Sequence, residues 1–195
     1  TWLEPLASSQ HNPVPYRRST QGNPRMTGPQ PPACDIHQGY RPGLIGRITE
    51  MHALYYDRAA GFGLPFEVVV SGGLSEFAGR LDRPMNAIWS AVAEGRVLGS
   101  IAIDGEDLGG GLAHLRWFIV DDALRGSGAG KRLLRAALDF VDARGFQACH
   151  LWTFSGLAAA RHLYETHGFA LAEERPGRQW GSEVLEQRFV RSRPR

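Results

Sequence analysis

The chain has 195 residues, enough for one sizeable domain, and 43% of them are hydrophobic. Its formal net charge of +2 gives no indication of nucleic-acid binding, and no apolar run approaches the roughly 18 residues of a membrane span. The two cysteines, Cys34 and Cys149, stand in different contexts and do not suggest a disulfide framework, so we expect a cytoplasmic protein.

Residues 1–35 differ in composition from the rest of the chain. They hold seven of the twelve prolines and few aliphatic residues, which is typical of an extended or flexible leader. A single folded domain is expected over residues 36–195. The leader is interpreted either as an artefact of how the chain was defined or as an arm that docks on the domain or on a second copy.

The first half of this domain shows the periodicity of two helices and several strands. Ser75 is a candidate N-cap, and Glu94-Gly95 has the composition of a hairpin turn. In chain order we expect an edge strand at 35–39, a helix at 44–60, a loop at 62–66, a short helix at 74–81 and strands at 86–93 and 96–104.

The second half alternates strands and helices after an acidic, glycine-rich turn at 104–111. We expect a central strand at 112–120, a helix from near 131 to 145, a strand at 146–154, a helix at 158–167, a strand at 169–174, a turn at 176–177 and a last strand at 183–191. This order predicts an α/β (α+β) fold: a mixed, mostly antiparallel, twisted sheet of about six or seven strands with helices on both faces.

The glycine-rich stretch between the central strand and the following helix predicts an anion site. Residues 125–130 read R-x-x-G-x-G and lead directly into the helix. The first amides of a helix have no intrahelical acceptor, and glycines let a phosphate approach the backbone. Lys131 is followed by Arg132, so the stretch is not a Walker A loop, and it lacks the Rossmann fingerprint as well.

This form, directly after a strand that ends in Val120, resembles the acetyl-CoA loop of the GNAT acetyltransferase superfamily. A second stretch resembles the family's A-x-x-L-Y-E-x-x-G-F signature, although Leu157 stands where members often carry Asn. The resemblance covers roughly residues 36–192 and is closest to the acetyltransferase half of MarR–acetyltransferase fusion proteins. The residues that match the second signature are Ala160, Leu163, Tyr164, Glu165, Gly168 and Phe169.

The resemblance implies the GNAT fold, acetyl-CoA as cofactor and a set of site residues. Tyr164 is the expected general acid, which protonates the departing thiolate. His114 is a candidate general base, with a satisfied strand histidine and Glu106 acting through water as alternatives. No metal is expected. The expected cofactor-binding residues are Phe118, Ile119, Val120, Arg125, Gly126, Ser127, Gly128, Ala129, Gly130 and Lys131.

Aromatic residues are candidates for the wall of an acceptor site, although core packing is the default for any single one. The carboxylates of the 104–107 turn are expected to be solvated, with attraction of a cationic acceptor amine as the alternative. The expected acceptor-binding residues are Tyr55, Trp89, Trp117, Trp152 and Trp180.

The resemblance thus predicts an N-acetyltransferase that moves acetyl from acetyl-CoA to a primary amine by direct attack in a ternary complex. The acceptor is a small-molecule or peptide amine, and a homodimer is common in the family. The alternative is an acyl-CoA-binding regulatory or sensor module with little or no turnover. A third hypothesis, DNA-associated regulation, rests on the fusion-protein resemblance alone, and 35 residues are too few for a winged helix, so we expect no direct nucleic-acid binding.

Overall fold

A computed structural model of the chain describes residues 31–193, so most of the predicted leader lies outside the described residues. None of the helices in this part is both long and apolar enough to cross a membrane. In chain order the elements are β1 (Asp35–Gln38), α1 (Leu44–Ala60), α2 (Leu64–Ala78), β2 (Ala87–Ala93), β3 (Arg96–Asp104), β4 (Leu112–Val120), a short 3-10 helix (Asp122–Leu124), α3 (Ala129–Arg144), β5 (Ala148–Phe154), α4 (Ala158–Glu165), β6 (Ala170–Gly177) and β7 (Val184–Ser192).

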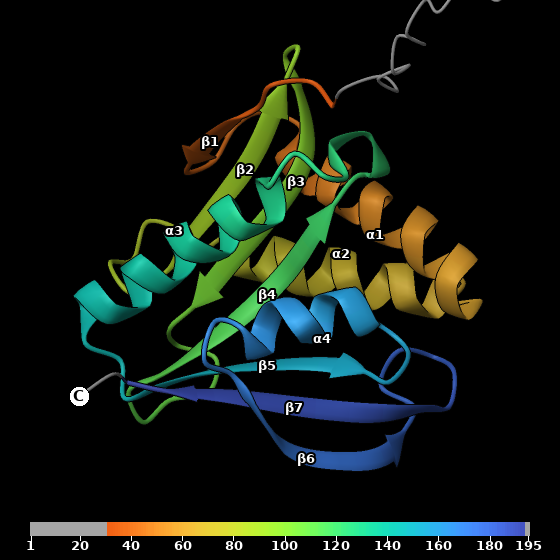
Figure 1. The fold of residues 1–195 in the computed structure, drawn as a ribbon, viewed down its shortest axis with the longest axis vertical. Helices are drawn as coiled ribbons and strands as arrows, with labels where there is room; N and C mark the ends of the chain where they lie inside the picture. Colours follow the sequence, from red (N-terminus) through yellow and green to blue (C-terminus); the bar gives the residue numbers. More distant parts are fainter. Residues whose placement is uncertain (1–30, 194–195) are drawn as a thin grey trace, which may run out of the picture. The chain divides into compact units, whose positions relative to one another are not determined.

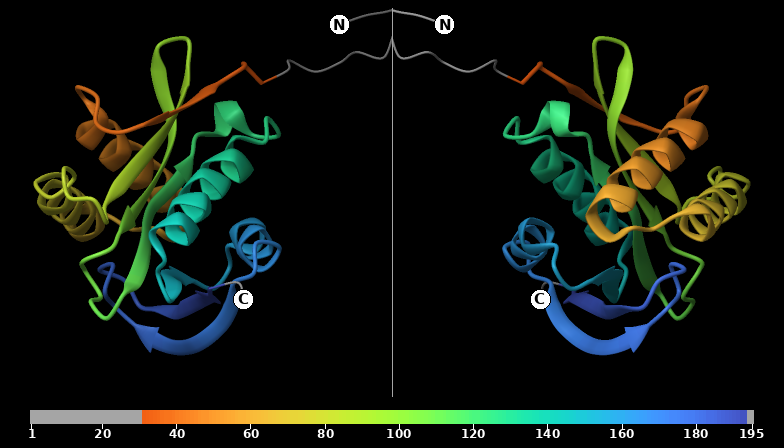
Figure 2. Two further views of the ribbon diagram at one scale, coloured as in Figure 1. Left: turned by 90° about the vertical axis from the view of Figure 1, so that its left-hand side faces the viewer. Right: turned by 90° about the vertical axis from the view of Figure 1, so that its right-hand side faces the viewer.

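The strands of the described residues form one seven-stranded sheet in the order β1-β2-β3-β4-β5-β7-β6 (Figure 1). Neighbouring strands in this sheet run antiparallel, except that β4 and β5 run parallel. Helices α1 and α2 cover one face, and α3 and α4 cover the other (Figure 2). The predicted mixed, mostly antiparallel sheet with helices on both faces is confirmed.

Each face of the sheet has its own apolar core. Leu133 and Leu134 of α3 are fully buried on one face, and Ile48 of α1 and Phe77 of α2 are fully buried on the other. Burying a side chain of this size contributes roughly 2 kcal/mol. The helices are therefore held against the sheet chiefly by apolar packing.

Local signals predicted the first helix and the first hairpin correctly. Helix α1 spans Leu44–Ala60 as expected, and Gly61 ends it with a φ of 66°. Glu94 and Gly95 join β2 to β3 with φ angles of 50° and 75°, the left-handed pair that a two-residue hairpin turn needs.

The prediction for the second helix was wrong in its extent. Helix α2 begins at Leu64 instead of residue 74, so the expected loop at 62–66 is largely helical and Ser75 is not an N-cap. Pro65 stands in the first turn, where a missing N–H costs nothing. Phe66, Val70 and Phe77 are buried at helical spacing, and this packing outweighs the low helix propensity of the Gly72-Gly73 pair.

The predicted turn at residues 176–177 was also wrong. Pro176 and Gly177 lie in β6, paired with Leu185 and Val184 of β7. Strand β6 is an edge strand, and an edge tolerates proline because one side of the strand has no ladder partner. The chain turns only after Gly177.

Candidate active site

The central strand β4 is paired on both sides for only part of its length. On the β5 side, the pairing covers Leu112–His114 and ends where His114 meets His150. On the β3 side, β4 stays paired up to Val120. Beyond His114, the edge of β4 that faced β5 has no strand partner among the described residues, so an extended ligand can pair there as an added strand.

A β-bulge between β3 and β4 lies just beyond the point where β4 and β5 separate. The register between β3 and β4 shifts near Trp117, which has a left-handed φ of 47°. The hydroxyl of Ser100, fully buried on β3, donates a hydrogen bond of 2.7 Å to the carbonyl oxygen of Trp117. Arg116 and Trp117 consequently lie on the same side of the strand, with the guanidinium carbon 4.1 Å from the centre of the Trp117 ring.

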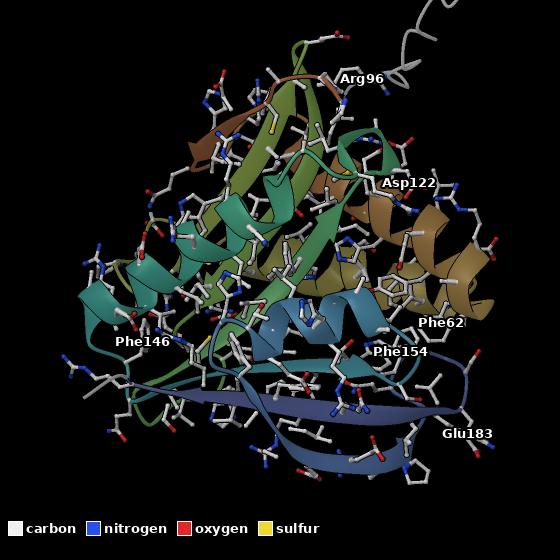
Figure 3. The ribbon with its side chains drawn as sticks, viewed as in Figure 1. Phe62, Arg96, Asp122, Phe146, Phe154 and Glu183 are labelled. Atoms are coloured by element: carbon white, nitrogen blue, oxygen red, sulfur yellow. The ribbon has the colours of Figure 1, made fainter. Side chains whose placement is uncertain are left out.

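A cavity of about 310 Å³ lies at this opening. Phe154 of β5 lines it and packs against Phe62, which follows α1, with ring centres 5.3 Å apart; both are labelled in Figure 3. The cavity is lined by His52, Tyr56, Phe66, Val69, Val70, Leu108, His114, Leu115, Arg116, Trp117, Phe118, Leu151, Trp152, Thr153, Phe154, Tyr164, Gln179 and Trp180.

Six of the sequence-predicted site residues line this one cavity. They come from β4, β5, α4 and the β6–β7 connection, which are far apart in the sequence. The structure therefore brings the candidate acid, the candidate base and part of the candidate acceptor wall together in one cavity. The six are His114, Trp117, Phe118, Trp152, Tyr164 and Trp180.

Two predicted acceptor residues lie elsewhere. Trp89 of β2 faces α3, where its ring packs 5.6 Å from that of Phe140, and it does not line the cavity. Tyr55 lines a second cavity of about 170 Å³, together with Ile119 and Val120. The second cavity lies beside the end of β4, near the glycine-rich turn that precedes α3.

The glycine-rich turn has the geometry expected of an anion site. Gly126 and Gly128 have φ angles of 79° and 77°, and a Cβ on either would meet no atom within 4 Å. The first intrahelical bond of α3 runs from the Arg132 amide to the Gly128 carbonyl, so the amides of Gly130 and Lys131 precede it. These outward amides and the helix dipole favour a negative charge.

The remaining residues of the turn have separate roles. Ser127 caps locally, because its hydroxyl donates to the Leu124 carbonyl and accepts from the Ala129 amide. Ala129 is buried, so only its backbone could contribute to a ligand site. The Arg125 guanidinium is mostly exposed and pairs with Asp122 at 2.6 Å, from where it can reach a surface anion.

Tyr164 of α4 presents a protonated phenol to the cavity. The residue is 7% exposed, and its ring packs near Phe118, Phe169 and Phe189. Burial, with smaller effects from Tyr56 and Tyr55, raises the pKa of Tyr164 well above its usual range. The hydroxyl therefore keeps its proton at physiological pH and can act as a donor.

His114 is oriented as a neutral base. Its Nδ1 lies 2.5 Å from a carboxylate oxygen of Asp107, and its ring meets Trp152 edge to face. Burial lowers the pKa of His114 to about 4, although the hydrogen bond to Asp107 acts in the opposite direction. Because a carboxylate can only accept, Nδ1 carries the proton and Nε2 is left able to take one.

His52 is a second neutral imidazole in the cavity wall, and the sequence analysis missed it. Its Nδ1 donates to the Ile48 carbonyl at 2.9 Å, which leaves Nε2 unprotonated. Burial lowers the pKa of His52 to about 4. In the sequence it occupies a position on the apolar face of α1, so nothing there distinguishes it from a core residue.

The acidic turn after β3 is solvated in part, as expected, because Glu106 and Asp107 are exposed, but the expectation was wrong for Asp104. Asp104 is fully buried and forms two hydrogen bonds with Arg80, at 3.0 and 2.9 Å. Burial acts to raise the pKa of Asp104, but the bonds from Arg80 and from the Glu106 amide lower it overall. Glu106 pairs with Arg80 and Arg83. None of these carboxylates lines the cavity.

In residues 31–193 there is no group of three or more His, Cys, Asp and Glu side chains placed to hold an ion.

The chain is similar to known proteins in sequence and in fold. A model of the Acetyltransferase (GNAT) family matches residues 50–169. The N-acetylaspartate synthetase of Xenopus tropicalis is 35% identical over 89 residues, which are 46% of this chain and 32% of that protein. The match thus spans about a third of that relative's length.

Two solved structures illustrate the likeness in fold. A GNAT-family acetyltransferase from Staphylococcus aureus has a TM-score of 0.66 at 18% identity, over 82% of this chain and 99% of that one. The yncA protein of Salmonella typhimurium, solved with its cofactor acetyl-CoA, has a TM-score of 0.66 at 19% identity, over 84% and 95% of the two chains.

Proposed function

Because the chain belongs to the Acetyltransferase (GNAT) family, we propose that it is an N-acetyltransferase that transfers acetyl from acetyl-CoA to a primary amine. The observation that carries the proposal is the parting of β4 from β5 beside the glycine-rich start of α3. Within residues 31–193 the edge of β4 beyond His114 has no strand partner, and the first turn of α3 lies against it, since a Cβ at Gly130 would be 3.7 Å from Val120 and 3.8 Å from Phe118. This is the arrangement that an extended chain ending in a pyrophosphate requires.

The residues at this opening fit acetyl-CoA. The edge of β4 from Phe118 to Val120 offers backbone groups to the pantetheine arm, as an added strand would. The amides of Gly130 and Lys131 face the pyrophosphate, with the glycines of the turn leaving room for it. Arg125 adds a charge-assisted contact at the surface.

The bound cofactor supplies a thioester carbonyl for the amine to attack, with the CoA thiolate as leaving group. Tyr164 donates its phenolic proton to the departing sulfur, which makes the thiolate a better leaving group. We propose that the acetyl group passes directly to the amine, and the position of both cysteines outside the cavity lining supports this.

A base is needed because an ammonium group must lose a proton before it attacks. We assign this role to His114, whose Nε2 is free to accept a proton while Asp107 holds Nδ1. His52 is the alternative base, held by the Ile48 carbonyl in the same protonation state. A neutral imidazole is available as a base over the whole physiological range.

The first experiment is calorimetric titration of the protein with acetyl-CoA. Gly128→Glu places a negative charge at the proposed pyrophosphate site and should weaken binding at least about 100-fold. Gly95→Glu is the matched control, since it also introduces a side chain at a left-handed, uncrowded glycine but in the distant β2–β3 turn. Equal binding by both variants would contradict the cofactor site.

Release of CoA in the presence of a panel of amines then tests turnover. N-acetylaspartate synthetase is named for an acetylated amino acid, so amino acids belong in this panel. Tyr164→Phe should bind acetyl-CoA like the wild type and lower kcat about 100-fold. Binding without turnover of any amine would favour the sensor alternative. The cytoplasmic location, the homodimer and the kinship with MarR fusion proteins stay predictions.

A further inference from the structure

The cavity has an uneven charge. Among the described residues that line it, Arg116 is the one side chain with a permanent charge. The other lining groups are aromatic rings, aliphatic side chains, hydroxyls, one amide and two neutral imidazoles. An acceptor with a negative group would find a partner in this wall, whereas a second positive charge would be repelled.

The acids near Arg116 leave most of its hydrogen-bonding capacity unused. Its contacts with Asp104 at 3.4 Å and Asp107 at 3.7 Å both involve Nη1. Asp104 is already satisfied by Arg80 and by backbone amides. Within residues 31–193 the structure shows no hydrogen bond from Nε or Nη2 of Arg116, so donors remain for a ligand.

The guanidinium is also held in place. It stacks on the Trp117 ring at 4.1 Å. Helix α2 lies beside this stacked pair, because a Cβ at Gly73 would lie 3.1 Å from Nη2 of Arg116 and 3.5 Å from the Trp117 ring. A planar donor that is fixed before binding loses little conformational freedom when it binds a carboxylate.

We propose that Arg116 binds the carboxylate of the acceptor, and that the acceptors of this protein are α-amino acids. This inference rests on the proposed acetyl transfer. An α-amino acid has one carbon between its amine and its carboxylate. Arg116 lines the same cavity as His114 and Tyr164, the proposed base and acid, so a carboxylate held at Arg116 keeps the amine inside that cavity.

The test compares acceptors that differ only in the carboxylate. L-Phenylalanine and L-leucine are measured against L-phenylalaninamide and L-leucinamide, with CoA release as the rate and calorimetry on the CoA-saturated protein as the binding readout. Wild type should prefer the acids about 10- to 100-fold in kcat/KM, the range expected for hydrogen bonds to a charged group. Arg116→Gln should remove this preference, so that the ratio of kcat/KM for the acid to kcat/KM for the amide falls to about 1.

Two further variants separate recognition from structure. Arg83→Gln changes an arginine of the neighbouring ion pairs that does not line the cavity, and it should keep the preference. Arg116→Lys keeps the charge without the planar donor pair, so it should keep part of the preference. Equal loss of acid and amide turnover in Arg116→Gln would indicate a structural role and overturn the proposal.

The outcomes distinguish this inference from the function on which it rests. Arg116-dependent binding of amino acids without turnover would support the carboxylate site and contradict acetyl transfer. Turnover of amides or simple amines at the rate of amino acids would support acetyl transfer and overturn the carboxylate site. Failure of amino acids both to bind and to react would overturn the carboxylate site as well.

Discussion

Residues 112–114 of β4 pair with β5, and His114 pairs with β3 as well, whereas beyond His114 the strand pairs with β3 alone. The part that pairs with β5 contains no residue with a positive φ. The singly paired part contains the bulge, a left-handed tryptophan and the cavity. One strand thus serves two purposes. At one end its pairing with β5 stabilises the sheet, and at the other end its unpaired edge is available to the proposed ligand.

In the open part of β4, which is the part beyond His114, neighbouring side chains hold Trp117 in an unfavourable backbone conformation. A non-glycine residue in the left-handed region costs on the order of 1 kcal/mol or more. Trp117 is held there by the Ser100 hydroxyl, by the Arg116 guanidinium and by the ring of Phe77, 5.2 Å from its own. We call residues 112–114, which pair with β5, the closed end of β4. We therefore expect changes near the closed end to affect stability alone, and changes near the bulge to affect both stability and acetyl-CoA binding.

The largest effect is expected at the closed end. Gly105 directly follows β3, and a Cβ there would lie 2.4 Å from the Met85 carbonyl oxygen and 2.5 Å from the Phe146 ring. Gly105→Ala should lower the free energy of unfolding by about 3 kcal/mol, because a backbone atom must move. Gly72→Ala, in open space on α2, should instead raise it by up to about 1 kcal/mol.

Denaturant unfolding measures both changes, and calorimetry measures acetyl-CoA binding by the folded variants. A changed dissociation constant for acetyl-CoA in Gly105→Ala would contradict the expectation that the two ends of β4 act independently.

An effect of about the same size is expected from acid, acting on the wall of the open part. The pKa of His52 is about 4 in the folded protein, against an ordinary value of 6.5. Between these values the unfolded chain binds more protons, so stability is complete above pH 6.5 and decreases as the pH falls toward 4. His52 alone should account for about 3 kcal/mol of this loss.

His52→Asn keeps a side-chain donor for the Ile48 carbonyl but does not titrate. Its free energy of unfolding, measured from pH 7 to pH 4, should fall less steeply than that of the wild type. The remaining slope should come largely from His114, whose pKa is lowered in the same way. Identical slopes would mean that His52 is not a buried neutral imidazole.

The smallest effect is expected at the bulge itself. Ser100→Ala removes the donor to the Trp117 carbonyl and should cost about 1–2 kcal/mol, with weaker acetyl-CoA binding. Ser90 is its matched control, since it is the register partner of Ser100, is also fully buried, and its hydroxyl has no hydrogen-bond partner among the described residues. Ser90→Ala should be neutral or stabilising.

Equal costs for the two serine variants would show that the Ser100 hydrogen bond does not support the bulge. Unchanged acetyl-CoA binding in Ser100→Ala would show that the open edge does not depend on the bulge.

The sequence predicted those elements whose signals are local. Helix α1 has regular apolar spacing and a terminal glycine, and the β2–β3 turn has its two left-handed residues adjacent in the chain. The start of α2 and the extent of β6 depend on burial and on an edge position, which no short stretch encodes. Both errors came from treating proline and glycine as residues that interrupt helices and strands, as they do on average.

The same limit applies to the site. The glycine-rich turn and Tyr164 could be found by motif, because their spacing along the chain is fixed. Trp89 and Trp117 look alike in the sequence, yet one packs against α3 and the other lines the cavity. The bulge decides the position of Trp117, and a bulge changes the alternation without leaving a signal of its own.

The bulge also has an evolutionary consequence. It puts residues 116 and 117 side by side toward α2, while Phe118 and Val120 pack toward the α3 face. Two adjacent codons thus contribute to the proposed acceptor wall, and the codons that follow specify the proposed acetyl-CoA edge. Point mutations at the first two codons can therefore change the proposed acceptor wall without changing a side chain of the proposed acetyl-CoA edge.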